Sequence, residues 1–254
     1  MPEDTGDMRP ALGTGVLGVR LLQHDVIDST NLEALRLAEA GARVGTVVVA
    51  ETQAQGRGRL GRRWLDLPGR CLLMTVLLEP PADHPGRLTA AAALSVAEAV
   101  EALGGAPQLK WPNDVLLHGR KVAGILGEGA RSGLVAVGIG VNVNGSPGDL
   151  PAELQQRATF LSHELGREFD RDGLRDEILQ RLDESYHALR SGEGRAVMRR
   201  IAPYDCLRGR RVELLVAGGS VRGEASGWRH DGSMQIRDDR GRSYVVRGGE
   251  ITLL

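Results

Sequence analysis

The chain has 254 residues, of which 41% are hydrophobic and 26% charged, as is ordinary for a soluble globular protein with one large core. Its 32 basic and 33 acidic residues nearly cancel, so the surface as a whole is not an electrostatic nucleic-acid binder. The sequence shows no membrane span, signal peptide, disulfide framework or zinc-ligand spacing, and a cytoplasmic protein is therefore expected.

The first part of the chain carries alternating strand and helix signals behind a polar tail. Residues 1–18 are expected to form a frayed tail. Asp28, Ser29 or Thr30 can accept hydrogen bonds from the first turn of a helix, and Gly41 suits its end. Apolar β-branched runs predict strands, and an apolar stripe at helical spacing predicts a second helix. The strands are expected at 19–27, 44–50 and 71–78, and the helices at 28–41 and 87–105.

The second part of the chain changes character near residue 204. Before that point, hairpin-type turns separate four strand signals, and one long amphipathic helix follows them. The strands are expected at 107–111, 114–118, 121–129 and 133–143, and the helix at 169–192. After it, short strands and Gly-rich turns predict a small β-barrel of about fifty residues that leans on the main domain. The expected division is a main domain over 19–204 and a barrel over 205–254.

A basic, glycine-rich loop separates the second and third predicted strands. It reads GRGRLGRR over 56–63 and is followed by Trp64. Glycine lets the backbone approach a ligand closely, and the arginine fork matches phosphate or carboxylate. The loop lacks the pattern of a Walker phosphate-binding loop. Either it folds over an anionic ligand, or it is a solvated surface loop.

A second group of polar residues lies in KWPNDVLLHGRKVAGILGEG, residues 110–129. Pro112 breaks the strand, so Lys110 and Asp114 are presented at a corner between two strands. Lys121 follows at a hairpin edge, and Gly124 permits close approach to the strand backbone. These charges either surround an anionic substrate or belong to an ordinary turn and hairpin.

Two weaker signals flank these segments. DSTN, residues 28–31, offers hydroxyl, amide and backbone N–H groups that form a polar cup, although a simple helix cap explains the same string. GIGVNVN, residues 138–144, offers a glycine surface on which a flat ring or a phosphate could lie. Small residues in a packed strand are the alternative for this second segment.

Taken in order, these four segments resemble the biotin protein ligase family, from about residue 24 to the end of the chain. The resemblance implies an α+β fold, with a mixed-sheet catalytic domain of the class II aminoacyl-tRNA synthetase and biotin ligase type, followed by a small SH3-like β-barrel. It implies a two-step reaction. Biotin and ATP give biotinyl-5′-AMP, and biotin is then transferred to a lysine of a biotin carboxyl carrier protein.

The resemblance also implies roles for individual residues. Mg²⁺ is expected to arrive with ATP, so no metal ligands in the protein are expected. The residues expected to bind biotin are Ser29, Thr30, Asn31, Gln53, Gly56, Arg57, Gly58, Arg59, Trp64, Lys121 and Gly124. Those expected to bind ATP or the adenylate are Arg57, Arg59, Arg62, Lys110, Lys121 and Asn142. Those expected to act catalytically are Lys121, Arg59 and Asp114.

Two departures from the family pattern bear on function. Leu60 stands where the family loop commonly has arginine, which removes one positive charge. Only about twenty residues precede the first strand, too few for the three-helix DNA-binding domain that some members carry, so no DNA binding is predicted.

Several alternatives stay open at the level of sequence. The rival activities are a lipoate or octanoate ligase of the same fold, a biotin sensor without catalysis, and an RNA-binding module. The last is disfavoured because only 3% of residues are aromatic. A homodimer through paired sheet edges is also left open.

Overall fold

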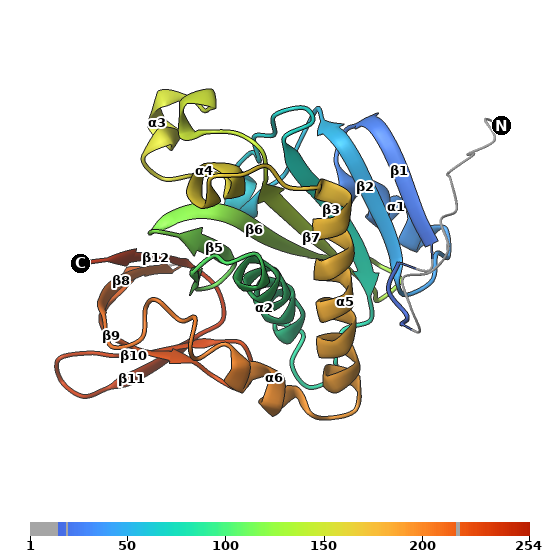
Figure 1. Ribbon diagram of the computed structural model, residues 1–254. Helices are drawn as coiled ribbons and strands as arrows, with labels where there is room; N and C mark the ends of the chain where they lie inside the picture. Colours follow the sequence, from blue (N-terminus) through green and yellow to red (C-terminus); the bar gives the residue numbers. More distant parts are fainter. Residues whose placement is uncertain (1–14, 19, 217–218) are drawn as a thin grey trace.

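Seven strands form one mixed sheet in the computed structural model, which describes residues 15–18, 20–216 and 219–254 (Figure 1). The first two strands in the sheet order are parallel, and every other neighbouring pair is antiparallel. The order across the sheet is β1 (Arg20–Ile27), β2 (Thr46–Gln53), β3 (Cys71–Leu78), β7 (Val135–Asn142), β6 (Arg120–Gly129), β5 (Asp114–Leu117) and β4 (Pro107–Lys110). The predicted mixed α+β fold is confirmed.

Helices cover both faces of this sheet. Helices α2 (Arg87–Ala102) and α5 (Arg171–Arg190) pack together over one face, and α1 (Thr30–Glu39) covers the other (Figure 1). Buried alanines along α2 keep it close to the sheet, in which β3 is buried on both faces. The sequence did not predict the short helices η1 (Arg59–Gly61), η2 (Pro147–Asp149), α3 (Ala152–Gln155), α4 (Leu161–Leu165) and α6 (Gly194–Arg200).

The C-terminal strands form a second, antiparallel sheet. Its order is β11 (Ser243–Val246), β10 (Met234–Arg237), β9 (Gly219–Trp228), β8 (Arg211–Val216) and β12 (Glu250–Leu253). In the described part of the chain β11 and β12 do not pair, and closure of a barrel requires its two edge strands to pair. The predicted small barrel is therefore found as an open five-stranded sheet.

Trp111 joins the two sheets. It is 1% exposed and packs in the apolar core of the C-terminal sheet, although it belongs to the corner between β4 and β5. Its indole N–H donates to the carbonyl of Gly232 at 3.1 Å. The second sheet therefore leans on the first, as its small size led us to expect.

The N-terminal residues that are described are held against α5. Residues 1–14 of the predicted tail lie outside the described residues. Leu17 is 2% exposed, and the N–H groups of Val16 and Leu17 donate to Asp183 Oδ1 at 3.0 and 3.1 Å. The frayed tail predicted over 1–18 therefore does not extend over residues 16 and 17, because a carboxylate satisfies their backbone.

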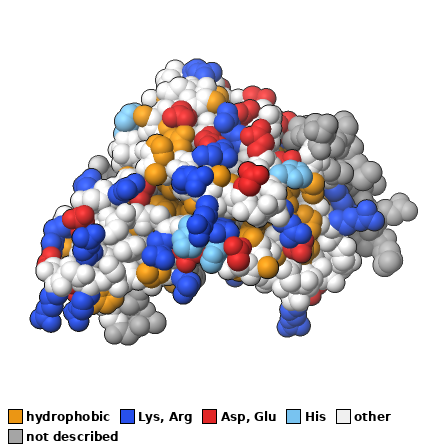
Figure 2. All heavy atoms as spheres, turned by 90° about the horizontal axis from the view of Figure 1, so that it is seen from below, with side chains coloured by type: hydrophobic (Ala, Val, Ile, Leu, Met, Phe, Trp, Pro, Cys, Tyr) orange, Lys and Arg blue, Asp and Glu red, His pale blue; other side chains and the backbone are white. Residues whose placement is uncertain are grey.

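Two features of the surface bear on partners. No helix among the described residues is long and apolar enough to cross a membrane. On the face shown in Figure 2, basic and acidic side chains are interspersed over much of the surface. This distribution agrees with the formal net charge of −1.

Candidate active site

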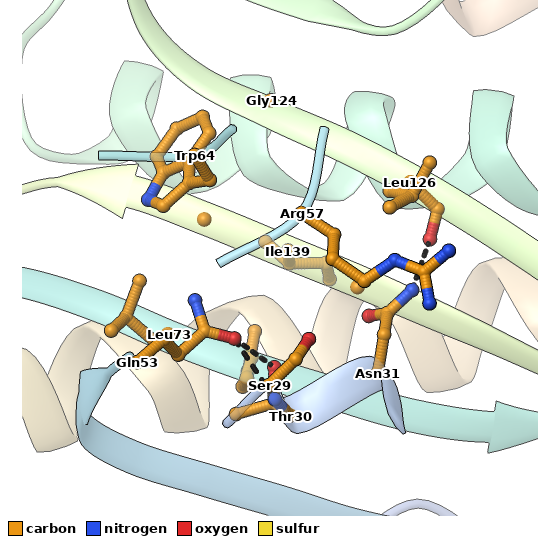
Figure 3. Close-up of a pocket in the computed structure, with 13 residues that line it drawn as sticks. Ser29, Thr30, Asn31, Gln53, Arg57, Trp64, Leu73, Gly124, Leu126 and Ile139 are labelled. Atoms are coloured by element: carbon orange, nitrogen blue, oxygen red, sulfur yellow. Dashed lines mark hydrogen bonds between the residues drawn. The ribbon is translucent and has the colours of Figure 1, made fainter. Parts of the chain in front are cut away.

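A pocket lies on the face of the large sheet that α1 covers (Figure 3). It has about 310 Å³ of empty space, part of it open to solvent. Its wall comes from the start of α1, the end of β2, the arginine loop, and the strands β3, β6 and β7. The lining residues are Ser29, Thr30, Asn31, Gln53, Arg57, Trp64, Leu73, Met74, Gly124, Leu126, Gly138, Ile139 and Gly140.

A buried hydrogen-bond network forms one side of the pocket. Gln53 Oε1 accepts from the N–H of Thr30 at 2.9 Å and from its hydroxyl at 3.1 Å. Among the described residues nothing accepts from the side-chain amide of Gln53, so its hydrogens can bind a ligand. Ser29, at the cap position of α1, makes no side-chain capping bond to the described residues. The polar cup predicted from DSTN is therefore a better description than a helix cap. Gln53 reaches this place because β2 continues three residues past its predicted end.

Asn31 supports the wall of the pocket. Its amide nitrogen donates to Glu128 Oε2 at 2.9 Å and to the carbonyl of Leu126 at 3.3 Å. Its Oδ1 accepts from the Thr75 hydroxyl at 2.7 Å. Because these bonds already use both ends of the amide, Asn31 orients its neighbours more than it offers free groups to a ligand.

Two glycines let Trp64 lie flat against the sheet. A Cβ at Gly140 would come within 2.7 Å of the Trp64 ring, and one at Gly124 within 3.0 Å. The sequence predicted that a flat ligand ring or a phosphate could lie on this glycine surface, whereas the ring found there belongs to the protein. The indole nitrogen of Trp64 is buried and has no hydrogen-bond partner within the described part of the chain, so it can donate to a bound ligand.

Lys121 does not line the pocket but lies beside Trp64, which does. Its Nζ is 2.6 Å from Asp114 Oδ1 and 5.4 Å from the centre of the Trp64 ring. Two of the three charges that the sequence grouped at this corner, Lys121 and Asp114, are therefore paired, and both side chains are partly exposed. A Cβ at Gly124 would come within 2.7 Å of Nζ, which explains why a glycine suits this position.

The arginine loop folds back on itself. The N–H of Gly58 donates to the carbonyl of Arg62 at 2.8 Å, and the N–H of Trp64 donates to the carbonyl of Gly56 at 3.0 Å. At the tip, Leu60 is 70% exposed and adopts a left-handed conformation with φ of 56°. The charge that the family arginine would supply is therefore lost at the solvent-facing tip. A second cavity, with about 600 Å³ of empty space, is lined by Ala54, Gln55, Gly56, Arg57, Gly58, Gly61, Arg62 and Arg63.

Arg57 connects the loop to the pocket. Its guanidinium lies 2.8 Å from Glu128 Oε1, on the carboxylate that also accepts from Asn31. In Figure 3, Arg57 and Trp64 lie across the pocket from Ser29 and Thr30. Arg57 lines both cavities, so it can contact a ligand that extends from one to the other.

Arg59 and Arg62 connect the loop to the C-terminal sheet. Arg59 Nη1 donates to Asn113 Oδ1 at 3.2 Å and to the carbonyl of Gly249 at 3.4 Å, and burial lowers the pKa of Arg59. Arg62 forms an ion pair with Glu250, and its hydrogen bond holds the pKa of that carboxyl below the ordinary value. These partners are the kind that a phosphate can replace.

Four of the six residues expected to bind the nucleotide line neither cavity: Arg59, Lys110, Lys121 and Asn142. Asn142 is 6% exposed, and its amide nitrogen donates to the carbonyl of Thr159 at 3.0 Å. Lys110 is half-buried at the end of β4, opposite Asp114 in the strand pairing. The predicted contact of Asn142 with a nucleotide is not supported, because its polar end is used to hold the backbone beside β7.

Some lining residues were not predicted from the sequence. Leu73, Met74, Leu126 and Ile139 form the apolar part of the pocket. Their strands read as ordinary core, so no local signal distinguishes them. Glu128 was also missed, because its partners Arg57 and Asn31 lie far from it along the chain.

No cluster of three or more His, Cys, Asp or Glu side chains in the described ranges could hold a metal ion. This finding concerns the protein side chains alone. A divalent ion bound by the phosphates of a nucleotide needs no such cluster.

Comparison with known proteins gives the family. Residues 24–144 match the sequence pattern of the family described as "Biotin/lipoate A/B protein ligase family". The biotin–[acetyl-CoA-carboxylase] ligase of Mycobacterium tuberculosis is 32% identical over an alignment of 270 positions, which covers 99% of this chain and 96% of the relative. The chain belongs to the biotin protein ligase family. The bifunctional ligase/repressor BirA of Bacillus subtilis is 41% identical over 187 residues, but they cover only 58% of its length.

A solved structure of this biotin protein ligase family has the same fold. The biotin protein ligase of Aquifex aeolicus, solved in complex with biotin and ATP, is 33% identical and superposes with a TM-score of 0.82. The match covers 92% of this chain and 98% of the Aquifex chain.

Proposed function

We propose that this protein makes biotinyl-5′-AMP from biotin and ATP and then transfers biotin to a lysine of a biotin carboxyl carrier protein. The observation that carries this proposal is the place of Lys121. Its ammonium pairs with Asp114 and lies 5.4 Å from the ring of Trp64, which lines the pocket and directly follows the arginine loop. A neutral ring with a charged tail fits that arrangement.

The pocket suits the ureido ring of biotin. That ring offers two N–H donors and one carbonyl acceptor and carries no charge. The free amide hydrogens of Gln53 can donate to the carbonyl, and the hydroxyl of Ser29 can accept from an N–H. The apolar floor formed by Leu73 and Ile139 suits the carbon skeleton.

In the first step, an oxygen of the biotin carboxylate attacks the α-phosphorus of ATP, and the bond to pyrophosphate breaks. No general base is needed because the carboxylate is already ionised at neutral pH. Lys121 stabilises charge on the carboxylate and the phosphoryl oxygens, and Arg57 and Arg59 neutralise phosphate charge. Mg²⁺ arrives with ATP, bound by the phosphates.

In the second step, the amine of the carrier lysine attacks the activated carbonyl, and AMP leaves with the bonding electrons. The amine must lose a proton, and Asp114 is proposed to position it or relay that proton. Transfer from isolated adenylate at the full rate by Asp114→Asn would remove this role. Closure of the arginine loop over the adenylate excludes water from a mixed anhydride that hydrolyses readily.

Further parts of the proposal concern the whole chain. We propose that the main domain spans 19–204 and that residues 205–254 form an SH3-like unit, supported by an apolar core to which, among the described residues, Trp111 is the one buried contributor from the main domain. We propose a cytoplasmic location, where ATP and carrier proteins meet. No DNA binding is predicted, because the formal net charge is close to zero. A homodimer is proposed through the edge strand β1, on which Val26 is 69% exposed.

Exchange of pyrophosphate into ATP tests the function directly. Purified protein is supplied with biotin, lipoate, octanoate or no acid, and exchange is expected with biotin alone. Exchange with lipoate or octanoate instead would assign the protein to the lipoate side of its family. Tight biotin binding without exchange would make it a sensor.

A further inference from the structure

One buried carboxylate, outside the pocket, connects two segments that flank Lys121. The side chain of Glu164, in α4, is 6% exposed. Its Oε1 accepts from the Thr159 hydroxyl at 2.5 Å and from Arg120 Nη2 at 2.6 Å. Its Oε2 lies 2.6 Å from His118 Nδ1. His118 and Arg120 lie in and beside the turn between β5 and β6, whereas Thr159 lies in the segment that leads into α4.

The same segment also holds the backbone of Lys121. The N–H of Lys121 donates to the carbonyl of Arg157 at 2.7 Å, and its carbonyl accepts from the N–H of Thr159 at 2.9 Å. Lys121 is thereby paired in parallel with Ala158. On its other side it is paired with Leu116 of β5. The Lys121 backbone is therefore held between two segments, which Glu164 connects.

The direction of the Lys121 side chain depends on this local backbone. The pairing of β5 and β6 is irregular here, because Leu116 faces Lys121 while the preceding Val115 faces Ala123. Val122 is thus an extra residue on β6, and such a residue bends a strand and redirects its side chains. The adjoining turn contains His118 with φ of 48°, which is uncommon for a residue other than glycine. Contacts from outside the hairpin help such a backbone to persist.

Glu164 is ionised at neutral pH. Burial raises its pKa, but the hydrogen bonds from Thr159 and His118 and the charge of Arg120 outweigh that effect, so the pKa lies below its ordinary value. Removing the hydrogen-bond donors from a buried carboxylate is costly. The bonds to Glu164 therefore favour one arrangement of the β5–β6 turn relative to residues 157–159.

We propose that Glu164 is a positioning residue for the adenylation step, because it holds the β5–β6 turn against residues 157–159 and so sets where the Lys121 ammonium meets the reacting groups. This inference rests on the proposed function for its effect on rate. Its structural part concerns Lys121 alone and can be measured separately.

The first experiment compares exchange rates with biotin affinity. Glu164→Ala is expected to lower the rate of biotin-dependent exchange about 100-fold, since a displacement of about 1 Å has that effect on reacting groups. Biotin affinity measured without ATP is expected to stay near that of the wild type. Thr159→Val, which removes one hydrogen bond, is expected to lower the rate about tenfold.

Two further variants serve as controls. Glu164→Gln is expected to recover most of the rate, because its Oε1 can still accept from Thr159 and Arg120 and its amide can donate to His118. Glu153→Ala removes an exposed carboxylate in α3 and is expected to exchange at the wild-type rate. If Glu164→Ala does not fold, Glu164→Gln and Thr159→Val decide the question by the same measurements.

The second experiment reads the position of Lys121 without catalysis. The chain has only two lysines, so Lys110 is an internal reference when an amine-directed acylating reagent is mapped by mass spectrometry. In Glu164→Ala the ion pair of Lys121 with Asp114 is expected to loosen, so the ratio of Lys121 to Lys110 labelling should rise several-fold. In Glu164→Gln the ratio should return to the wild-type value.

The outcomes separate the two proposals. Wild-type exchange and an unchanged labelling ratio in Glu164→Ala would overturn the positioning role. Equal losses of exchange and biotin affinity in both Glu164 variants would also overturn it, since they indicate a general structural defect. If the wild type shows no exchange with biotin, the proposed function fails, and the labelling ratio still decides whether Glu164 positions Lys121.

Discussion

The pocket and the arginine loop lie next to each other but hold their polar groups in different ways. In the pocket, Thr30 and Gln53 are buried and joined by neutral hydrogen bonds. In the loop, Arg57 and Arg62 are largely exposed and paired with carboxylates. Neutral groups are thus held in one arrangement before a ligand arrives, whereas charged groups have partners that a ligand can replace.

This difference follows from the cost of burial. A buried neutral donor or acceptor is acceptable once it has a partner, and the network then keeps its geometry. An exposed ion pair contributes little to stability, about 0–1 kcal/mol, so exchanging a carboxylate for a phosphate costs little. Ring recognition is therefore built into the sheet, and charge recognition is left to the loop.

The largest expected effect comes from Lys121, which lies where the two regions meet. Lys121→Ala should lower biotin-dependent exchange by about 10²–10³-fold, because a preorganised cation aimed at developing charge is removed. Biotin affinity without ATP should change much less. Exchange and equilibrium binding measured on the same preparation check this.

Lys110→Ala serves as the comparison for that variant. It removes the same charge, whereas the ammonium that pairs with Asp114 and lies over the Trp64 ring belongs to Lys121, so the effect of Lys110→Ala should be smaller. Equal losses in the two variants would mean that net charge, and not the position of Lys121, is what matters.

A large effect on the pocket alone is expected from Gly140→Ala. The added Cβ would come within 2.7 Å of the Trp64 ring, and overpacking of this kind costs about 1–3 kcal/mol. Biotin affinity should fall about tenfold to 100-fold, as read by calorimetry. Gly129→Ala is the matched control in β6, since a Cβ there meets nothing within 4 Å. Unchanged affinity in Gly140→Ala would show that Trp64 does not form the pocket wall in solution.

A moderate effect is expected from Thr30→Val. The change removes the hydroxyl that donates to Gln53 and costs about 1–3 kcal/mol, so biotin affinity should fall about tenfold or more. The KM for ATP should stay close to that of the wild type, since the loop charges are untouched. Thr52→Val, one residue before Gln53 in β2, is the control. A change in the KM for ATP as large as the change in biotin affinity would contradict the separation of the two regions.

The smallest effect concerns the contact between the loop and the C-terminal sheet. The hydrogen bond from Arg62 lowers the pKa of Glu250 below its ordinary value of 4.5. The contact therefore stabilises the fold above about pH 4.5, and this contribution is lost as the pH falls through the lowered pKa. Thermal midpoints of the wild type and Glu250→Gln should differ slightly at pH 7 and converge in acid. A difference that grows in acid would have the wrong sign for this ion pair.

Much of the site was predicted from local sequence. Ser29, Thr30, Gln53, Arg57 and Trp64 all line the pocket as expected. Local patterns singled out the DSTN string and the arginine loop, whereas the roles of Gln53 and Trp64 were implied by the resemblance to the family. Most strands and long helices were also found within a few residues of their ends, because apolar periodicity depends on near neighbours.

Tertiary structure decided which of these residues meet. Trp64 occupies the glycine surface that looked free for a ligand, Asn142 is turned into the backbone beside β7, and the C-terminal strands leave their sheet open. Glu164 and Glu128 had no distinct role in the sequence because their partners lie far along the chain or across strands. Sequence alone thus determined the order of elements and the chemistry of the loop and pocket. The contacts between the residues of the site were decided by strand order and register, because these depend on pairing between segments far apart in the sequence.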